Sequence, residues 1–562
     1  MKLFGNSDKP DVQSAYSLYC KGKAFNYQID LENNVRVNED MFVGKQWEGV
    51  QANGLPTPVF NILKRDVCFT VANITSDNLK VQGTPLAATP RTNDLIEPAR
   101  IFTEECEAVM ERNNIVSLLR EFARDAAVRG DGCLYTYWDA DAETGMEAKG
   151  MIRTETVENT RVFFGNPNDR HVQSQPYIQI ASRECVRSVQ DRARENGFEN
   201  WQAIAPDLET DIQSWALWTD DKVTVLLTMW YNPETKSIWA YESTQMCGVR
   251  EPWDMGIRRY PIVWLNWDYI QNSYHGMAMI TGLIPNQIFI NKVWAMSMLS
   301  VMSTAYPKVL FDKTRISKWT NRVGEAIGVN GGDMNTVAKL MSPAMVSPQI
   351  SEFIQLAVEQ TNQSLGATAV ALGDTRPDNT SAIIALQRAA STPSEITKQN
   401  LHKCVEELAL IYLEFMAEYY GKREVDMETP EQLDKVFEFV GEDVPAEIPV
   451  EFDFGELKDI PMQMKLDVGA SSYYSEIASI QTMDNLLQLG KITVEQYLAR
   501  IPDGYIPDRR GLLAEIKRAT QQAMQAQAAQ SAEGDVAEQG IEEEIPTGGG
   551  YSALQRKINE GA

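Results

Sequence analysis

The sequence predicts an α+β fold that is divided into several domains. Its 562 residues are long enough for more than one hydrophobic core. Short strand-like runs gather between Cys133 and about residue 270, and long helical patterns lie on both sides of them. Strands grouped in one stretch and helices in others are typical of this fold class.

The N-terminal third contains the first predicted elements. Residues 1–36 are polar, and we expect them to be irregular. Residues 38–74 predict a short helix, a Gly-Pro loop and a second helix, and the run LKVQ that follows predicts a strand. A Pro-rich linker then leads to a long helix over 94–129, which ends at the turn Gly130-Asp131-Gly132.

The β-rich part holds most of the tryptophans. Its predicted strands include CLYTYWD, RVFFG, YIQIA, KVTVLLTMWY and SIWAYES. Eight of the 12 Trp residues lie between Trp201 and Trp267. Together with acidic neighbours they could form a sugar-binding face. We favour the alternative, that they fill a β-rich core or a subunit interface.

Helical periodicity returns after His275. It predicts helices over 276–304 and 347–366, separated by the strand-like AYPKVLF and a segment rich in Lys and Arg. A polar loop then precedes a helix that must kink or restart at the capping box Thr392-Pro393-Ser394-Glu395. Its packed face is predicted to consist of Leu401, Val405, Leu408, Tyr412, Phe415 and Tyr419.

The C-terminal part begins with an acidic linker and the strand-like IPVEFDF. A helical stretch follows, with Gly490 as its C-cap, and a second capping box over 493–496 opens another helix. An Ala/Gln-rich helix over 508–532 leads into an acidic tail, which we expect to be mobile.

Composition narrows the classes of function. The net charge of −26 argues against a protein that grips phosphates over its whole face, but allows nucleic acid to pass without being held. The 7 cysteines are scattered, as is typical of reduced thiols in a cytosolic protein. We expect no signal peptide, and no membrane helix because polar residues interrupt 277–306.

Motifs for catalysis are missing from the sequence. The three histidines, His171, His275 and His402, are far apart, so each is expected to be a satisfied surface or core residue. No P-loop, GxSxG, HExxH or EF-hand pattern occurs. We therefore expect no enzyme, no metal site and no cofactor.

The polar loop that begins at Ala371 predicts turns rather than a binding pocket. Gly373 and Pro377 set the turns, and Asn379 or Thr380 is placed to cap the helix that begins at Ala382. Small side chains and nearly balanced charges offer a smooth surface, which makes a poor catalytic site.

The sequence resembles the portal proteins of tailed bacteriophages in four stretches. The first is NEDMFVGKQWEGVQANGLPTPVFNILKR, with Gly44, Trp47, Gly54, Pro56 and Asn61 placed as in many portals. The others are REFARDAAVRGDGCLYTYWD, LGDTRPDNTSAIIALQRAA and VGASSYYSEIASIQTMDNLLQLGKITVEQYLARIPDG. Their order, and the helix–loop–kinked-helix middle, carry the resemblance.

The resemblance implies a multi-domain ring subunit. Its parts would be an N-terminal arm (1–37), a mixed α/β wing (38–275 and 422–465), two stem helices (276–304 and 347–366), a small clip (305–346), a tunnel loop (367–381), a long kinked helix (382–421), a helical crown (466–532) and a flexible acidic tail (533–562).

The resemblance also implies function and partners. The chain would form a homo-oligomeric, commonly dodecameric, ring at one capsid vertex of the virion, after assembly in the host cytoplasm. Double-stranded DNA would pass through it during packaging and ejection. Its partners would be the terminase large subunit, the major capsid or scaffolding protein and head–tail connector proteins.

Two groups of site residues follow from this resemblance. The tunnel loop would face DNA through Gly373, Asp374, Thr375, Arg376, Pro377, Asp378 and Asn379. The clip would dock the terminase through Lys308, Lys313, Arg315, Lys318 and Arg322. The alternative for the clip cations is an ordinary solvated charged face.

Two other functions stay open at this point. A head–tail connector is one, although connectors are usually much shorter. A Trp-rich carbohydrate-active enzyme is the other, which would suit the β-rich region but not the long capped helices.

Overall fold

The computed structural model of the protein describes residues 10–50, 54, 56–77, 79–86, 92–143, 149–207, 221–305, 309–320, 327–331, 333–340, 348–364, 394–428, 447–468, 483–498 and 512. The chain divides into two compact units, Met1–Gly469 and Ala470–Ala562, which are described separately. The first unit combines helices with small antiparallel sheets, so the predicted α+β class is confirmed.

The N-terminal part begins with one helix that the sequence pattern did not predict and a second that it predicted only from Asn38 onward, at its C-terminal end. α1 (Val12–Gln28) and α2 (Leu31–Val43) occupy most of the stretch expected to be irregular, so that expectation was wrong. The Asp11 carboxylate accepts from the Ser14 backbone N–H, while the Ser14 hydroxyl accepts from Asp11 N, which forms a capping box. Helix α1 buries only a narrow stripe of residues, so its sequence shows little apolar periodicity and did not indicate a helix.

The next helices frame the core. α3 (Ile62–Ile74) confirms the second predicted helix. The long helix predicted over 94–129 is two helices instead, α4 (Thr92–Arg112) and α5 (Ile115–Arg129). Asn114 between them has a φ of 49°, a left-handed conformation that Asn tolerates and that interrupts the helix.

Two antiparallel sheets follow α5. A three-stranded sheet has the order β3-β2-β9, with β2 (Asp131–Asp139) in the centre, β3 (Met151–Thr156) and β9 (Ile262–Asn266). A five-stranded sheet runs in sequence order through β4 (Val162–Phe164), β5 (Tyr177–Cys185), β6 (Lys222–Asn232), β7 (Ser237–Ser243) and β8 (Gly248–Asp254). All the quoted strand runs are thus confirmed. Short elements connect them: η1 (Asn159–Arg161), η2 (Val172–Ser174), α6 (Val186–Glu195) and η3 (Trp201–Ala203).

The tryptophans of this region lie mainly in the interior. Trp230, Trp264 and Trp267 are buried, and Trp201, Trp239 and Trp253 are half-buried. Trp215 and Trp218 lie outside the described residues. The interpretation as an aromatic core is therefore confirmed for the described tryptophans.

Two two-stranded antiparallel sheets follow, and one of them joins distant parts of the chain. β1 (Leu79–Pro85) pairs with β14 (Met462–Val468), and β12 (Lys422–Glu428) pairs with β13 (Glu447–Asp453). The short helix η5 (Phe454–Asp459) connects β13 to β14. Only β1 and β13 were predicted. The chain after residue 421 thus returns to pack beside the N-terminal part.

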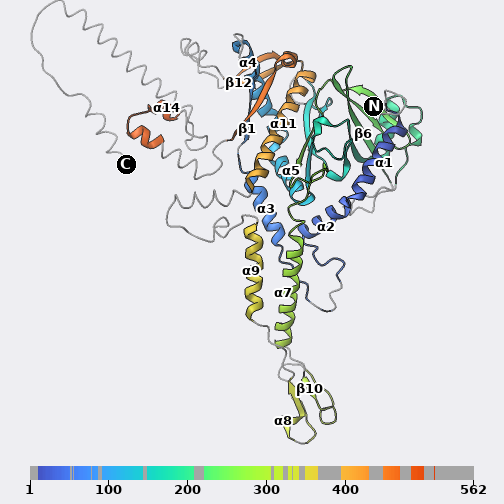
Figure 1. Ribbon diagram of the computed structural model, residues 1–562, viewed down its shortest axis with the longest axis vertical. Coiled ribbons are helices and arrows are strands. Elements are labelled where there is room, and N and C mark those ends of the chain that lie inside the picture. Colours follow the sequence, from blue (N-terminus) through green and yellow to red (C-terminus); the bar gives the residue numbers. More distant parts are fainter. Residues whose placement is uncertain are drawn as a thin grey trace, which may run out of the picture. The chain divides into compact units, whose positions relative to one another are not determined.

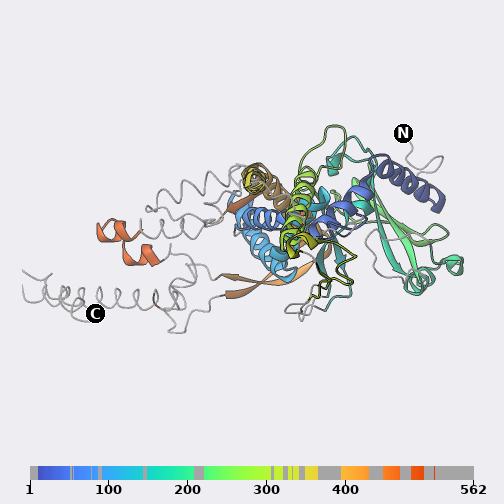
Figure 2. The same ribbon diagram turned by 90° about the horizontal axis from the view of Figure 1, so that it is seen from below.

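The helix α11 (Glu395–Tyr419) runs through the main core. Leu401, Leu408, Tyr412 and Phe415 are completely buried, Val405 is nearly so, and Tyr419 is half-buried against the same core, which confirms the predicted face. Of the capping box at which the helix was expected to kink or restart, Thr392 and Pro393 lie outside the described part, while α11 begins at Glu395 with Ser394 as its N-cap. Figure 2 shows α11 among the helices α3, α4 and α5 in a second view.

Two further helices and a small hairpin complete the first unit. α7 (Ile284–Ala305) and α9 (Pro348–Ser364) pack against each other and lie side by side in Figure 1. Between them in sequence come β10 (Val309–Phe311), α8 (Met334–Val337) and β11 (Ala338–Leu340). β10 and β11 pair in antiparallel register, with Leu310 opposite Lys339.

The second unit is described only in part. Residues 483–488 are helical, and Gly490 has a φ of 66°, as expected for the predicted C-cap. The Lys491 N–H donates to Leu486 O at 3.0 Å. Helix α14 (Val494–Leu498) starts directly after Thr493, where the second capping box predicted it.

Candidate functional site

The candidate site consists of the helices α7 and α9 and the β10–β11 hairpin, because these elements contain the predicted stem and clip. α7 starts later than predicted, at Ile284 instead of residue 276. Pro285 in the first turn fits this start. Proline has no backbone N–H, and an N–H in the first turn would have no acceptor within the helix. The expectation for α9 was close, at Pro348–Ser364.

Residues 273–277 are folded onto the three-stranded sheet, which explains the later start of α7. The buried Asp131 carboxylate accepts from the Gly276 N–H at 2.6 Å and from the Asn266 amide at 2.8 Å. His275 Nδ1 lies 2.6 Å from the other Asp131 oxygen. These bonds take the segment out of the helix before α7 begins.

A polar junction fixes α7 to residues 41–62. The Gln287 amide donates to Phe60 O at 2.7 Å, and its Oε1 accepts from the Ile62 N–H at 3.1 Å. Asn291 donates to Gln46 Oε1 at 2.6 Å. All three amide side chains are buried, and a buried amide without a partner would destabilise the fold. The polar residues that argued against a membrane helix thus anchor α7.

The residues that carried the resemblance shape the same junction. Gly44 ends α2 with a φ of 100°, which favours glycine. Asn61 caps α3 through the Lys64 N–H at 3.0 Å and donates to Phe42 O at 2.8 Å. The Trp47 indole N–H donates to Pro58 O at 2.9 Å. These motif residues therefore set the local structure beside α7.

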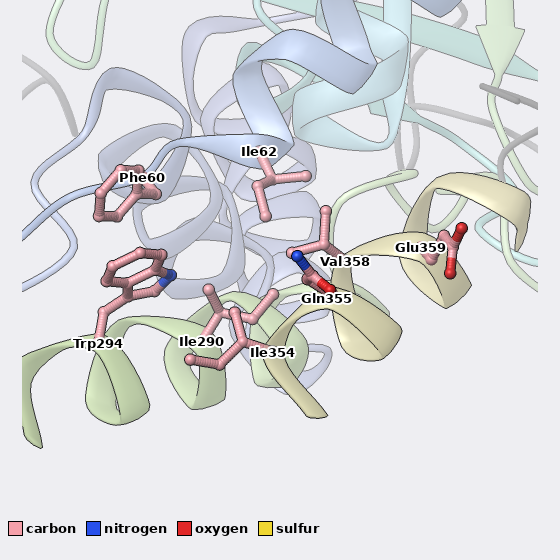
Figure 3. A pocket seen from close by; sticks show the side chains of 8 residues that line it. All are labelled: Phe60, Ile62, Ile290, Trp294, Ile354, Gln355, Val358 and Glu359. Carbon is pink, nitrogen blue, oxygen red and sulfur yellow. The ribbon is translucent and has the colours of Figure 1, made fainter. Parts of the chain in front are cut away.

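An open groove of about 490 Å³, called the stem groove below, lies beside this junction. It is lined by Phe60, Ile62, Ile290, Trp294, Ile354, Gln355, Val358 and Glu359 (Figure 3). The rings of Phe60 and Trp294 stack with centroids 4.7 Å apart. Its lining is apolar apart from Gln355 and Glu359, and Glu359 lies away from the stacked rings in Figure 3. The groove suits an apolar occupant more than a catalytic reaction.

The remainder of α7 carries exposed apolar side chains. These are Ile288, Phe289, Met296, Met298, Leu299, Val301 and Met302. Apolar helices are normally covered on most faces. α7 therefore presents surface that fits a protein partner.

The described clip residues form a small folded hairpin. Phe311 stacks on Trp319 with ring centroids 5.8 Å apart, and Ile316 between them in sequence is buried. The Thr314 hydroxyl and N–H donate to Asp312, which lowers the pKa of that carboxyl. Asp312 thereby shapes the turn that presents the neighbouring cations.

Two of the predicted clip cations, Lys313 and Arg315, lie in this turn, and Lys318 follows it. Lys313 and Lys318 are exposed, whereas Arg315 is half-buried and pairs with Asp312 at 3.5 Å. Strand β11 places the exposed Lys339 opposite Leu310 of β10, and the sequence reasoning did not include Lys339. The position of Lys339 at the end of the Lys/Arg-rich segment is the sequence feature that could have indicated it. Lys308 and Arg322 lie outside the described residues.

The predicted DNA-facing residues have no described geometry. Gly373, Asp374, Thr375, Arg376, Pro377, Asp378 and Asn379 all fall outside the described part of the chain. Helix α11, which follows these residues in the sequence, contacts the buried Asp77 through two side chains near its beginning. Lys398 Nζ lies 2.8 Å from the buried carboxylate of Asp77, and His402 Nε2 lies 3.3 Å from it.

The described residues offer no cluster suited to catalysis or metal binding. His171 is exposed, while His275 and His402 each pair with a different carboxylate, Asp131 and Asp77. No group of three or more His, Cys, Asp or Glu side chains among these residues is arranged to hold a metal. All 7 cysteines are free thiols, of which Cys106, Cys133, Cys247 and Cys404 are buried. Within the described part, no helix combines the length and the apolar character needed to cross a bilayer.

Comparison with known proteins gives one family. The family model of the phage P22-like portal proteins matches residues 239–427, about a third of the chain. The match runs from β7 through α7, the hairpin, α9 and α11 to β12. No curated protein matches the chain. Portal proteins are structural proteins rather than enzymes, and the match over residues 239–427 confirms the resemblance of this chain to the phage portal family.

Proposed function

We propose that this chain is the subunit of a phage portal ring. The ring, commonly a dodecamer, stands at one vertex of the capsid in the virion and is assembled in the host cytoplasm. Viral DNA enters through it during packaging and leaves through it during ejection. The observation that carries this proposal is the family match over residues 239–427, which spans the segments that we expect to form the stem and the clip.

The charge of the chain supports a channel for DNA. A net charge of −26 per subunit gives a ring little attraction for a polyanion, so DNA can slide through without tight binding. The motor would be a separate ATPase, which agrees with the missing P-loop sequence. The portal itself needs no cofactor under this proposal.

The clip cations are the proposed docking site for the terminase large subunit. Lys313 and Lys318 are exposed beside a turn that is braced by Asp312 and a stacked pair of rings. After packaging, head–tail connector proteins would take the place of the motor. The major capsid or scaffolding protein would hold the rest of the ring.

The tunnel loop is the proposed contact with moving DNA. Its only cation is Arg376, between Asp374 and Asp378. Replacing Arg376 with Ala should lower the amount of DNA packaged per procapsid, measured as nuclease-protected DNA. An unchanged amount would reduce Arg376 to a component of the turn.

Electron microscopy of the purified full-length chain tests the central proposal. Negative-stain images should show rings with a central hole wide enough for a DNA duplex. Monomers under all conditions would contradict the proposal. The carbohydrate-active alternative has lost its main support, because Trp230, Trp264 and Trp267 are buried instead of forming an exposed face.

A further inference from the structure

Helix α7 carries two apolar surfaces, and they lie on opposite sides of it. One is the stem groove, to which α7 contributes Ile290 and Trp294. The other, called the ridge below, consists of Met296 and Leu299, which are 56% and 42% exposed. At 3.6 residues per turn, Leu299 points about 180° away from Ile290 and Met296 about 160° away from Trp294. The two surfaces therefore cannot cover each other within one subunit.

The composition of α7 shows that both surfaces need a partner. Lys292 is its only charged residue among 22. Contact with water is unfavourable for each apolar side of a helix. If only one side of α7 is buried, the other apolar side stays in water. A partner that covers both sides must supply two different apolar surfaces.

We infer that the stem groove of one subunit receives the ridge of the next copy of this chain. This inference rests on the proposed function and names the surfaces that would join neighbours in the ring. Each copy carries one groove and one ridge, so a chain of such contacts leaves neither surface open. Such head-to-tail contacts close into a ring when the rotation allows it.

A two-fold dimer would satisfy the surfaces less well. A two-fold interface uses the same patch on both subunits, and surfaces on opposite sides of α7 cannot belong to one patch, so ridge would meet ridge or groove would meet groove. Either arrangement covers one surface and leaves the other in water. The opposite placement of the two surfaces on α7 thus favours a ring over a dimer.

The charges at the two surfaces are also complementary. Lys292 precedes Met296 by four residues, so it lies on the ridge side of α7 and is exposed there. Glu359 is exposed at one end of the stem groove. A ridge seated in the groove would bring opposite charges together at its edge, whereas two equal surfaces would bring like charges together.

Cysteine cross-linking tests which surfaces meet. In a background with the exposed Cys20, Cys68 and Cys185 changed to Ser, Met296→Cys and Phe60→Cys are introduced singly and together. The double variant should give a ladder of covalent oligomers under mild oxidation, and co-expressed single variants should give covalent dimers only. Cross-linking of Met296→Cys alone would reveal ridge-to-ridge contact and overturn the inference. Rings without any cross-link would overturn it as well.

Charge substitutions provide the second test. Met296→Glu or Leu299→Glu should weaken ring assembly roughly tenfold to a hundredfold, since each places a charge against an apolar groove. The matched control is Leu356→Glu on α9, where the side chain is 50% exposed but does not line the groove. Circular dichroism confirms that each variant is folded. Equal assembly of ridge variants and control would overturn the inference.

A charge exchange adds a rescue experiment. Lys292→Glu and Glu359→Lys should each weaken assembly, and the double variant should restore it, as measured by ring counts in electron micrographs. A double variant that is weaker than both single variants contradicts the inference. If the unmodified chain forms no rings, the portal proposal fails. If it forms rings and none of these substitutions changes the number of rings, only the groove-and-ridge contact is contradicted.

Discussion

The side-chain amide of Asn291 donates a 2.6 Å hydrogen bond to Oε1 of Gln46, and both residues are buried. This bond connects α7 with the turn that follows α2, 245 residues earlier in the sequence. Gln46 in turn donates to Met41 O at 3.1 Å, so the contact reaches back into α2. The beginning of α7 is therefore fixed by polar contacts, whereas apolar side chains further along it, such as Met296 and Leu299, are exposed.

Loss of the Asn291 amide should destabilise this junction. Asn291→Ala leaves Gln46 Oε1 buried without its donor, which should lower the free energy of unfolding by about 1–3 kcal/mol. Gln46→Ala should cost a similar amount, and the double variant should cost less than the sum because one bond is lost in both. Chemical unfolding of the four proteins measures this coupling.

A matched control for this prediction lies on the same helix. Thr304 is exposed, and its hydroxyl bonds only to Ser300 O one turn earlier among the described contacts. Thr304→Ala should therefore change the stability by less than about 0.5 kcal/mol. Strictly additive costs at Asn291 and Gln46 would contradict the coupling of the two side chains.

Much of the fold could be predicted where the pattern is local. The face of α11 repeats at steps of three and four, and the strands between Val162 and Ser243 are rich in β-branched and aromatic residues. The strand β14 was missed because its partner β1 lies far away in the sequence, so no hairpin signal marks it, and β12 was missed because its sequence KREVDME is mostly charged. α1 was missed because it buries few residues, which gives weak periodicity.

The site was predicted in part, for the same physical reasons. The clip cations are visible as a local charge cluster, and Lys313 and Arg315 do lie on one turn, with Lys318 shortly after it. The polar junction was not predicted, since the pairing of Asn291 with Gln46 depends on long-range packing. Two amide side chains four residues apart, Gln287 and Asn291, in an otherwise apolar helix were the signal that could have indicated it.

Gly130 is predicted to tolerate no side chain. Its φ is 101°, and an added Cβ would lie 2.8 Å from the backbone oxygen of Gly276. Gly130→Ala should destabilise the protein by about 2–4 kcal/mol, because strain in φ and a clash with backbone add up. Thermal unfolding checks this cost.

A substitution at Gly197 separates the strain in φ from the clash with backbone. Its φ is 83°, but nothing lies within 4 Å of an added Cβ. Gly197→Ala should therefore show only the conformational cost of about 1 kcal/mol. Equal losses for both variants would mean that the approach of the Gly276 backbone contributes nothing.

The buried Glu105 should make stability depend on pH. Burial raises the pKa of this carboxyl, while the Arg112 guanidinium, 2.9 Å away, and the Tyr420 hydroxyl oppose the shift. The folded chain thus holds the proton more tightly than the unfolded chain. Its contribution to stability is present at low pH and is lost as pH rises from the ordinary pKa of glutamate to the raised value.

Glu105→Gln isolates this contribution. The variant cannot lose the proton, so the difference in unfolding free energy, natural protein minus variant, should fall as pH rises through this interval. Arg112 stays charged throughout, so its lost partner shifts the whole curve without changing its slope. Chemical unfolding at a series of pH values measures the difference. Parallel curves for the two proteins would show that burial does not perturb Glu105.

The clip cations should act on a partner and not on the fold. The triple variant Lys313→Ala, Arg315→Ala, Lys318→Ala should still form rings but bind the terminase large subunit on the order of tenfold to a hundredfold more weakly. Arg315→Ala alone should have the smallest effect, because Asp312 already neutralises that guanidinium at 3.5 Å. Binding of the natural ring should weaken as salt concentration rises, and the variant should lose most of this salt dependence.

The control removes the same charge elsewhere. Lys21, Arg120 and Arg187 are exposed on α1, α5 and α6, outside the clip. Their triple replacement by Ala makes each subunit more acidic by the same amount, so a general electrostatic effect would weaken binding equally in both variants. Binding measured by surface plasmon resonance on assembled rings distinguishes the cases. Because the clip turn is braced by its own hydrogen bonds and ring stack, removal of its cations should leave the turn folded, so the weaker binding should be specific to the clip variant.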